Sequence, residues 1–281
     1  MTSTPSENVS PTAYATGYFW VRHGLSHPAL ATPQGKKLDR GFRLLIATTQ
    51  KVSGVSLEAM MLARHRGIDA RLTQAIEEGR VGQVIELAAG LTGRGLRFVQ
   101  SHGARLRYIE TDLPAMAATK RRLLAAAGLE TPNHRVVELD VLKDDGAESL
   151  AAVAGTLDPG VGTAIITEGL MNYLAPEDAQ AVWRRIAGTL RRFPRGTYLA
   201  DVYPRRQTHG MAMTAFGAVL SAFVRGRMHS HFQTPEEAVA AMRTAGFDNA
   251  RVIETRDIPE TRELASTPGA ERVRVLEALT V

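Results

Sequence analysis

The sequence of 281 residues contains no cysteine. This absence excludes disulfide bonds, thiolate nucleophiles and zinc sites built on cysteine. The longest apolar run, residues 211–224, is shorter than the roughly 20 residues that a membrane-spanning helix needs. The first twelve residues are polar and lack the apolar centre of a secretory signal. We therefore expect a cytoplasmic protein without a membrane anchor, whose chemistry uses oxygen and nitrogen groups.

Lysine and aromatic residues are also scarce. Only five of the 34 basic residues are lysine, and aromatic residues make up 6% of the chain. The arginines behind the net charge of +5 occur as scattered pairs and not as one stripe. Nucleic-acid binding favours a clustered basic face with aromatic side chains for stacking, so nucleic acid is not an expected partner. A small molecule is the expected partner, and a second copy of the chain is a further candidate.

The rhythm of apolar and polar residues divides the chain into three parts. Residues 1–12 are predicted to form a disordered tail, and residues 13–80 an N-terminal cap made of helices. Residues 81–281 alternate short apolar runs with amphipathic segments, which predicts an α/β domain. The alternation breaks at about residues 203–232, where we expect a lid-like insertion that contains the apolar segment 211–224.

The α/β part is predicted to form a doubly wound, mostly parallel sheet of seven strands. The expected strands are residues 83–87, 105–110, 134–140, 163–168, 196–202, 250–255 and 272–281. The expected helices between them are residues 93–102, 114–129, 148–157, 176–193 and 234–246. The last two strands follow each other with only a polar connection between them, so we expect them to form an antiparallel pair.

Ligands of open α/β sheets bind beyond the carboxyl ends of the strands, which directs attention to the strand ends. The loop ELAAGLTGRG (86–95) after the first strand carries small residues that permit close approach of a ligand. The loop lacks the spacing of a dinucleotide or nucleoside triphosphate motif, which disfavours NAD and ATP. The following three strands end at acids, namely Asp112, Asp140 and Glu168. Singly, each acid could be a cap or turn residue, but together they suit an adenosine moiety.

Several strings of the chain resemble one known family. They are ARHRGID (63–69), QVIELAAGLTGRGLRF (83–98), YIETDLPAMAATKRRLL (108–124), VVELDVL (136–142) and AIITEGLMNYL (164–174). The third string carries E-x-D-x-P with a lysine six residues after the proline, and the last carries E-G-x-x-x-Y-L. They resemble the leucine carboxyl methyltransferase and polyketide O-methyltransferase superfamily. The resemblance covers about residues 60–255 and implies a class I, Rossmann-like methyltransferase that uses S-adenosylmethionine (SAM).

The resemblance implies a set of cofactor-binding residues. They are Arg64, Glu86, Ala88, Gly90, Asp112, Asp140, Val141 and Glu168. By the same resemblance, Arg64 contacts the SAM carboxylate, Asp112 binds the ribose hydroxyls, and Glu168 lies by the amino group. Asp140 and Val141 flank the adenine. Ala88 stands where the family usually has glycine, and Arg66 is the alternative to Arg64.

The sequence says less about the residues that bind the methyl acceptor than about those that bind the cofactor. A carboxylate acceptor is already ionised at neutral pH, whereas a hydroxyl acceptor needs a general base, most often histidine. The candidate catalytic residues are Tyr173, His23 and His231. His229 and His231 lie two residues apart, but no third ligand is near in sequence, so no metal is expected.

The sequence favours O-methylation of a small molecule, with a role in secondary metabolism. The first alternative is methylation of the C-terminal carboxylate of a protein. The second is a SAM-binding protein without catalytic activity, for example a scaffold or regulatory subunit, and Ala88 is its only support in the sequence.

Overall fold

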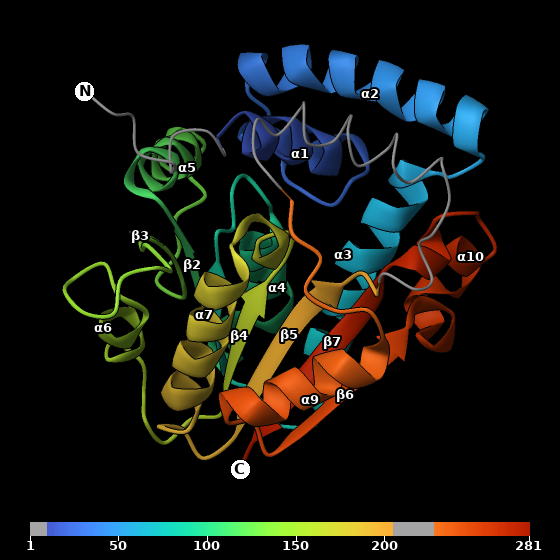
Figure 1. Ribbon diagram of the computed structural model, residues 1–281. Helices are drawn as coiled ribbons and strands as arrows, with labels where there is room; N and C mark the ends of the chain where they lie inside the picture. Colours follow the sequence, from blue (N-terminus) through green and yellow to red (C-terminus); the bar gives the residue numbers. More distant parts are fainter. Residues whose placement is uncertain (1–9, 205–227) are drawn as a thin grey trace, which may run out of the picture.

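The computed structural model describes residues 10–204 and 228–281 (Figure 1). Its centre is a seven-stranded sheet with the strand order β3-β2-β1-β4-β5-β7-β6. The strands are β1 (Gln83–Leu87), β2 (Arg107–Asp112), β3 (His134–Glu138), β4 (Thr163–Thr167), β5 (Gly196–Val202), β6 (Asn249–Glu254) and β7 (Arg274–Thr280). The first five strands are parallel, and β7 runs antiparallel to both β5 and β6. The predicted sheet with its antiparallel terminal pair is confirmed.

Helices cover both faces of the sheet. The α-helices are α1 (Ser10–Arg22), α2 (Pro33–Ser53), α3 (Leu57–Glu77), α4 (Arg94–His102), α5 (Pro114–Ala126), α6 (Leu150–Ala154), α7 (Pro176–Leu190), α9 (Pro235–Ala245) and α10 (Arg262–Ala265). The 3-10 helices are η2 (Pro28–Leu30), η3 (Gly103–Arg105), η4 (Met171–Tyr173), η6 (Thr255–Asp257), η7 (Pro259–Thr261) and η8 (Ala270–Arg272). Within residues 10–204 and 228–281, no helix is both long and apolar enough to cross a membrane.

Two apolar cores hold the layers together. Buried side chains of α6, α7 and α9 pack on one face of the sheet, around Ile85 and Ile165. Those of α3 and α4 pack on the other face, around Val84 and Ile166. The alternation of neighbouring residues between the two cores follows from the two-residue period of a strand. Both faces of the central strands are therefore buried, which is typical of a parallel sheet.

The ends of several elements follow from their local sequence. The Ser56 hydroxyl caps α3 by accepting a hydrogen bond of 3.1 Å from the backbone N–H of Ala59. Pro114 opens α5, where its missing N–H costs nothing. β2 begins at Arg107, two residues later than predicted, because residues 103–105 form the turn η3.

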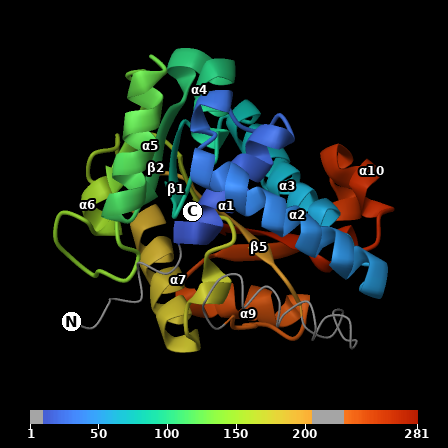
Figure 2. The same ribbon diagram turned by 90° about the horizontal axis from the view of Figure 1, so that it is seen from above.

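Helices α1 and α2 lie across the carboxyl ends of the parallel strands (Figures 1 and 2). A Cβ atom built on Gly17 of α1 would lie 2.5 Å from Cβ of Leu91, in the loop after β1. A Cβ atom on Gly90 would likewise lie 3.3 Å from Cβ of Ala13. Helix α1 therefore rests directly on the loop after β1. It begins at Ser10, inside the range assigned to the tail, and the proposed domain boundaries stay a prediction.

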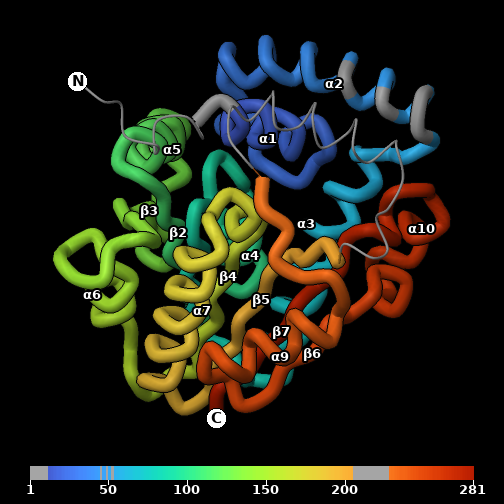
Figure 3. The backbone as a smooth tube through the Cα atoms, viewed as in Figure 1, coloured from blue at the N-terminus to red at the C-terminus, as the bar shows by residue number. Residues whose placement is uncertain are grey.

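The chain returns to the same end of the sheet after residue 228, beside η4 (Figure 3). The backbone N–H of His229 donates a hydrogen bond of 2.8 Å to the carbonyl oxygen of Asn172. The predicted lid-like insertion falls mostly on residues 205–227, and its apolar segment 211–224 lies outside the described residues.

Candidate functional site

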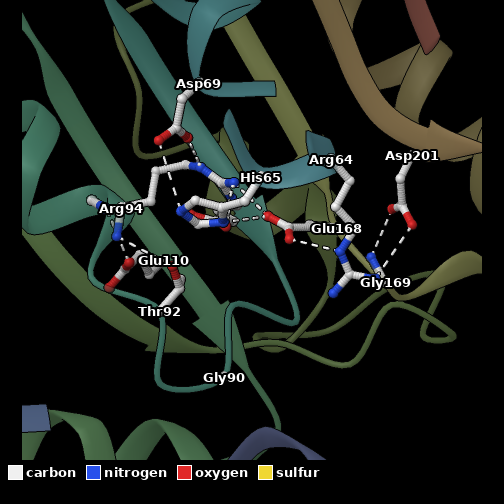
Figure 4. A network of polar contacts seen from close by, with 12 residues as sticks. Arg64, His65, Asp69, Gly90, Thr92, Arg94, Glu110, Glu168, Gly169 and Asp201 are labelled. Atoms are coloured by element: carbon white, nitrogen blue, oxygen red, sulfur yellow. Dashed lines mark hydrogen bonds and ion pairs between the residues drawn. The ribbon is translucent and has the colours of Figure 1, made fainter. Parts of the chain in front are cut away.

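A cluster of charged side chains lies at the carboxyl end of β4 (Figure 4). Glu168 follows the strand, and its Oε1 accepts a hydrogen bond of 2.9 Å from Nε of Arg64, which comes from α3. Nη1 of Arg64 donates to the hydroxyl of Tyr203 at 3.1 Å and lies 3.7 Å from Oδ2 of Asp201. The structure thus brings together two of the predicted cofactor-binding residues, Arg64 and Glu168, that are 104 positions apart in the sequence.

Arg94 is the buried centre of this cluster. Its side chain is 0% exposed and forms ion pairs with Glu86, Glu168 and Asp69, the last at 2.5 Å. Arg94 is the first residue of α4, where the positive end of the helix dipole disfavours a cation. Carboxylates in β1, just after β4 and in α3 offset both this effect and the loss of hydration.

The carboxyl group of Glu168 stays ionised in this setting. Burial alone would raise its pKa, but His65, Arg94 and Arg64 outweigh burial and hold the pKa well below its usual range. Glu168 is therefore a carboxylate at neutral pH, with its side chain 8% exposed. A partly accessible anion that already accepts from Arg64, Arg94 and His65 is suited to receive one further donor.

The loop after β1 adopts a backbone that favours glycine. Gly90 has a φ of 53° and Ala88 a φ of 52°, and Ala88 is the one non-glycine residue with positive φ in the described part of the chain. The backbone N–H of Gly90 donates a hydrogen bond of 2.7 Å to Oδ2 of Asp112. Oδ1 of the same carboxylate accepts one of 2.8 Å from the N–H of Leu113. Asp112 thus holds the loop, and burial raises its pKa.

We expect Ala88→Gly to raise the free energy of unfolding by up to about 1 kcal/mol, because the Cβ atom strains this conformation. Ala89→Gly is the matched control, since Ala89 has no positive φ. There the added freedom of the unfolded chain should lower stability by about 0.5–1 kcal/mol. Urea denaturation of both variants measures the two shifts. Equal destabilisation by both substitutions would show that Ala88 is unstrained.

Three more of the predicted cofactor-binding residues have partners inside the protein. The carboxylate of Glu86 is 2% exposed and contacts Arg94 and the hydroxyl of Tyr108, the latter at 2.6 Å. Oδ1 of Asp140 accepts a hydrogen bond of 3.0 Å from the N–H of Leu142, which makes Asp140 a turn residue as well. The carbonyl oxygen of Val141 accepts one of 2.7 Å from Arg185. Their roles toward SAM stay predictions.

A small cavity lies near the Arg64–Glu168 pair, since two residues that contact Arg64, Asp201 and Tyr203, are among its walls. Its volume is about 10 Å³, close to the space that one water molecule needs. Its walls include Asn172, Asp201, Tyr203 and His231. Oδ1 of Asp201 accepts a hydrogen bond of 2.7 Å from the N–H of Gly169, in the turn after Glu168. The cavity therefore lies where η4, the end of β5 and the segment after residue 228 meet.

His231 and Tyr173 lie at this end of the sheet. Nε2 of His231 lies 2.8 Å from the carbonyl oxygen of Met171, which can only accept, so Nε2 carries the proton and Nδ1 is an acceptor. Burial lowers the pKa of His231 from 6.5, and the ring is therefore mostly neutral at pH 7. Burial raises the pKa of Tyr173, so its hydroxyl keeps its proton.

The third candidate catalytic residue, His23, lies elsewhere. Its Nε2 is 3.3 Å from Oε1 of Glu58, in the first turn of α3. Glu58 precedes Arg64 by six residues, which is nearly two helical turns or about 9 Å along the axis. The structure therefore groups His23 with α1 and α3 and not with the cavity. Among residues 10–204 and 228–281, no three histidine or acidic side chains form a group that could hold a metal ion.

Sequence reasoning missed the polar residues that support Glu168. Arg94 could have been found, because a cation at the start of a helix needs acidic partners. Asp201 could have been found as the single carboxylate in the apolar strand β5, where only a buried partner makes it tolerable. His65 and Asp69, four residues apart on α3, are an i,i+4 pair. Their partners on other elements had no signal in the sequence.

Comparison with known proteins shows the family of the chain. A model of the leucine carboxyl methyltransferase family matches residues 28–187. A protein from Parafrankia sp., provisionally named a SAM-dependent methyltransferase, is 33% identical over 193 residues, which are 62% of this chain and 57% of that protein. One from Mycolicibacterium gilvum, with the same provisional name, is 38% identical over 120 residues, covering 43% and 37%. The chain thus spans between about a third and three fifths of the length of these relatives.

A solved structure has the same fold along almost the whole chain. It is a provisionally named methyltransferase from Thermobifida fusca, with a TM-score of 0.64 and 17% identity. The match covers 98% of this chain and 95% of that one. At this level of identity, the match establishes the shared fold.

Proposed function

Because the chain belongs to the leucine carboxyl methyltransferase family and is a SAM-dependent methyltransferase, we propose that it methylates an oxygen atom of a small molecule. The observation that carries this proposal is the cavity lined by Tyr203 and His231 beside the Arg64–Glu168 pair. The cavity has room for about one water molecule or one acceptor oxygen. Most of its walls are apolar or aromatic core side chains, and polar groups from η4, β5 and the segment after residue 228 complete them.

The residues present fit the chemistry of SAM. Asp112 offers a carboxylate at the end of β2, Gly90 lets the backbone approach closely, and Glu168 offers a second carboxylate. We propose that Asp112 binds the ribose hydroxyls, that Glu168 binds the amino group, and that Arg64 contacts the carboxylate. Asp140 and Val141 would flank the adenine, and Glu86 would act by holding Arg94. The cofactor supplies a methyl group activated by a sulfonium.

The residues at the cavity suit a hydroxyl acceptor. The Nδ1 atom of His231 is an unprotonated acceptor of a low-pKa ring, so it can take the proton of an alcohol or phenol. Burial raises the pKa of Tyr203, which lines the cavity, and of Tyr173, which is in η4 but not among the lining residues. Both hydroxyls keep their protons, and we propose that they donate hydrogen bonds that orient the acceptor. A carboxylate acceptor would need only orientation. In both cases, alignment of the acceptor oxygen and exclusion of water supply the rate increase.

The alternatives make different demands on the chain. A protein carboxylate acceptor needs an open groove, and the lid expected at residues 211–224 lies outside the described residues. A non-catalytic SAM-binding protein would need no general base, whereas His231 is held in the tautomer of one. We also propose a role in secondary metabolism and a cytoplasmic location. The absence of cysteine is compatible with the reducing cytoplasm.

Calorimetric titration with SAM and with its product S-adenosylhomocysteine (SAH) tests the cofactor site. We expect Asp112→Ala to weaken binding by about 100-fold, because two hydrogen bonds to a charged group are lost. Asp144→Ala is the control, since the carboxylate of Asp144 is 84% exposed and pairs only with Arg185 in the structure. Absence of SAM binding by the wild-type protein would refute the assignment.

The same titration separates Arg64 from Arg66. Arg64→Ala should weaken SAM binding, because its guanidinium lies between Glu168 and Tyr203. Arg66→Ala should leave the affinity nearly unchanged. The reverse result would move the carboxylate-binding role to Arg66.

A further inference from the structure

The ring of His65 is completely buried against Glu168. Its Nδ1 lies 2.9 Å from Oε2 of Glu168, and its Nε2 lies 3.0 Å from Nη2 of Arg97. The side chain is 0% exposed, and the ring stacks on Trp20 of α1 with centroids 4.2 Å apart and planes at 25°. The ring is therefore fixed in position by α1 and in rotation by polar partners on both nitrogen atoms, Glu168 and Arg94 at Nδ1 and Arg97 at Nε2.

The neighbours of the ring assign its proton. Arg97 can only donate, so Nε2 accepts a hydrogen bond from it and Nδ1 carries the proton. Two atoms lie 2.9 Å from Nδ1, Oε2 of Glu168 and Nη2 of Arg94, and of these only the carboxylate oxygen can accept that proton. In the opposite tautomer Nδ1 could accept from Nη2 of Arg94, but it would also lie 2.9 Å from a second acceptor, Oε2 of Glu168. Its Nε2–H would face the donor Nη2 of Arg97 at 3.0 Å. Its Nε2–H would find an acceptor only at Oδ2 of Asp69, 3.7 Å away. The first tautomer is thus the one that the contacts support.

This hydrogen bond completes the environment of Glu168. A carboxylate has about four lone-pair positions. Arg64 occupies one on Oε1, while Arg94 and His65 occupy two on Oε2. One position on Oε1 is left, and its direction is fixed because all three donors come from rigid, buried or half-buried groups.

We propose that His65 is a positioning residue for the amino group of SAM: by donating from Nδ1, it holds Glu168 with a single lone pair directed at the ammonium. This rests on the proposed role of Glu168. His65 acts through Glu168 and touches neither the cofactor nor the reacting atoms. The stack on Trp20 extends the arrangement to α1, the helix that covers the loop after β1.

Two replacements, asparagine and glutamine, distinguish the contributions of the two nitrogen atoms of the ring. The amide nitrogen of asparagine can occupy the position of Nδ1 and donate to Glu168, whereas glutamine reaches the position of Nε2 and keeps only the contact with Arg97. Both replacements lose the stack on Trp20, so the two variants form a matched pair. Thermal unfolding should show similar losses of stability for His65→Asn and His65→Gln.

The test is calorimetric titration of both variants and the wild type with SAH and with desamino-SAH, which lacks only the amino group. We expect His65→Gln to bind SAH at least about 10-fold more weakly and His65→Asn within about 3-fold of the wild type. Desamino-SAH should bind all three proteins with similar affinity, because it has no ammonium for Glu168 to receive.

The outcomes separate this proposal from the assignment of the cofactor site. The proposal is overturned if both replacements weaken the binding of SAH equally. It is also overturned if the binding of desamino-SAH is lost together with that of SAH. Either result would make His65 a packing residue. Unchanged SAH binding by His65→Gln would overturn it as well. If the wild type binds SAH and Asp112→Ala does not, the cofactor site stands in either case.

Discussion

Replacement of Arg94 by methionine is expected to lower the free energy of unfolding by about 3–5 kcal/mol, because it leaves buried carboxylates without their cation. Three acids, Asp69, Glu86 and Glu168, pair with this one guanidinium, which is 0% exposed. Methionine fills much of the volume but satisfies none of them. Urea denaturation at neutral pH measures the loss, and a reduced affinity for SAM should accompany it because Glu168 loses a partner.

A conservative variant and a surface control make the result interpretable. Arg94→Lys keeps the charge but not the three directions of the guanidinium, so its loss should be smaller. Arg121→Met removes a pair with Glu138 at 2.7 Å, in which the side chains are 42% and 38% exposed. Such a surface pair contributes about 1 kcal/mol or less. If Arg94→Met costs no more than Arg121→Met, the buried cluster does not stabilise the fold.

The second large effect is expected at Glu110, on the face of β2 opposite to Ile109. Its carboxylate is 0% exposed and lies 2.7 Å from Nζ of Lys120 and 2.9 Å from Nε2 of His134. It also accepts a hydrogen bond of 3.1 Å from the backbone N–H of Gly95. Glu110→Gln leaves the buried ammonium of Lys120 without a counter-charge, and we expect a loss of about 3–5 kcal/mol.

This cluster also predicts a dependence of stability on pH. Burial alone would raise the pKa of Glu110, but Lys120 and His134 outweigh it and lower the pKa from 4.5 to about 2. The stabilisation is therefore complete above pH 4.5, the unfolded value, and is lost as the pH falls toward about 2. Over this window the wild type should lose stability faster than Glu110→Gln.

Two measurements check the Glu110 prediction. Urea denaturation of both proteins at a series of pH values gives their difference in stability, which should shrink as the solution becomes acidic. A difference that stays constant through the window would contradict the assigned pKa. The double variant Glu110→Gln/Lys120→Met removes the unpaired ammonium and should therefore lose less than the two single losses combined.

The sequence predicted the sheet well because its strands are short apolar runs bounded by polar or glycine-rich turns. β1 and β5 have the predicted limits, since Gln83–Leu87 and Gly196–Val202 are buried on both faces and admit one interpretation. β2 was shifted by two residues because η3 is a turn whose residues have no distinctive pattern. The mostly parallel sheet followed from the alternation of strands with helices, and its antiparallel pair from the two consecutive strands at the end of the chain.

The site was predictable only where a strand end positions a residue. Asp112 ends β2 and Glu168 follows β4 directly, so the topology alone places them at the same edge. The partners of Glu168 come from α3 and α4. The pattern of charges along these helices does not specify how each helix is rotated about its axis. The sequence could not rank His23 and His231 as candidate catalytic residues. Only tertiary packing places His231 near Met171 and His23 near Glu58.

The order of strands at one edge of the sheet fixes the sequence in which that edge can open. Among the described strands, β6 pairs with β7 alone, whereas β7 lies between β5 and β6. A fluctuation can therefore release β6 while β7 remains hydrogen-bonded to β5, but β7 cannot leave without releasing β6. Backbone amides of β7 that bond to β5 are consequently exposed to solvent only in the larger and rarer opening. β5 carries Asp201 and leads to Tyr203. The site is therefore next to the β5–β7 pairing, which opens only after the β6–β7 pairing or together with it.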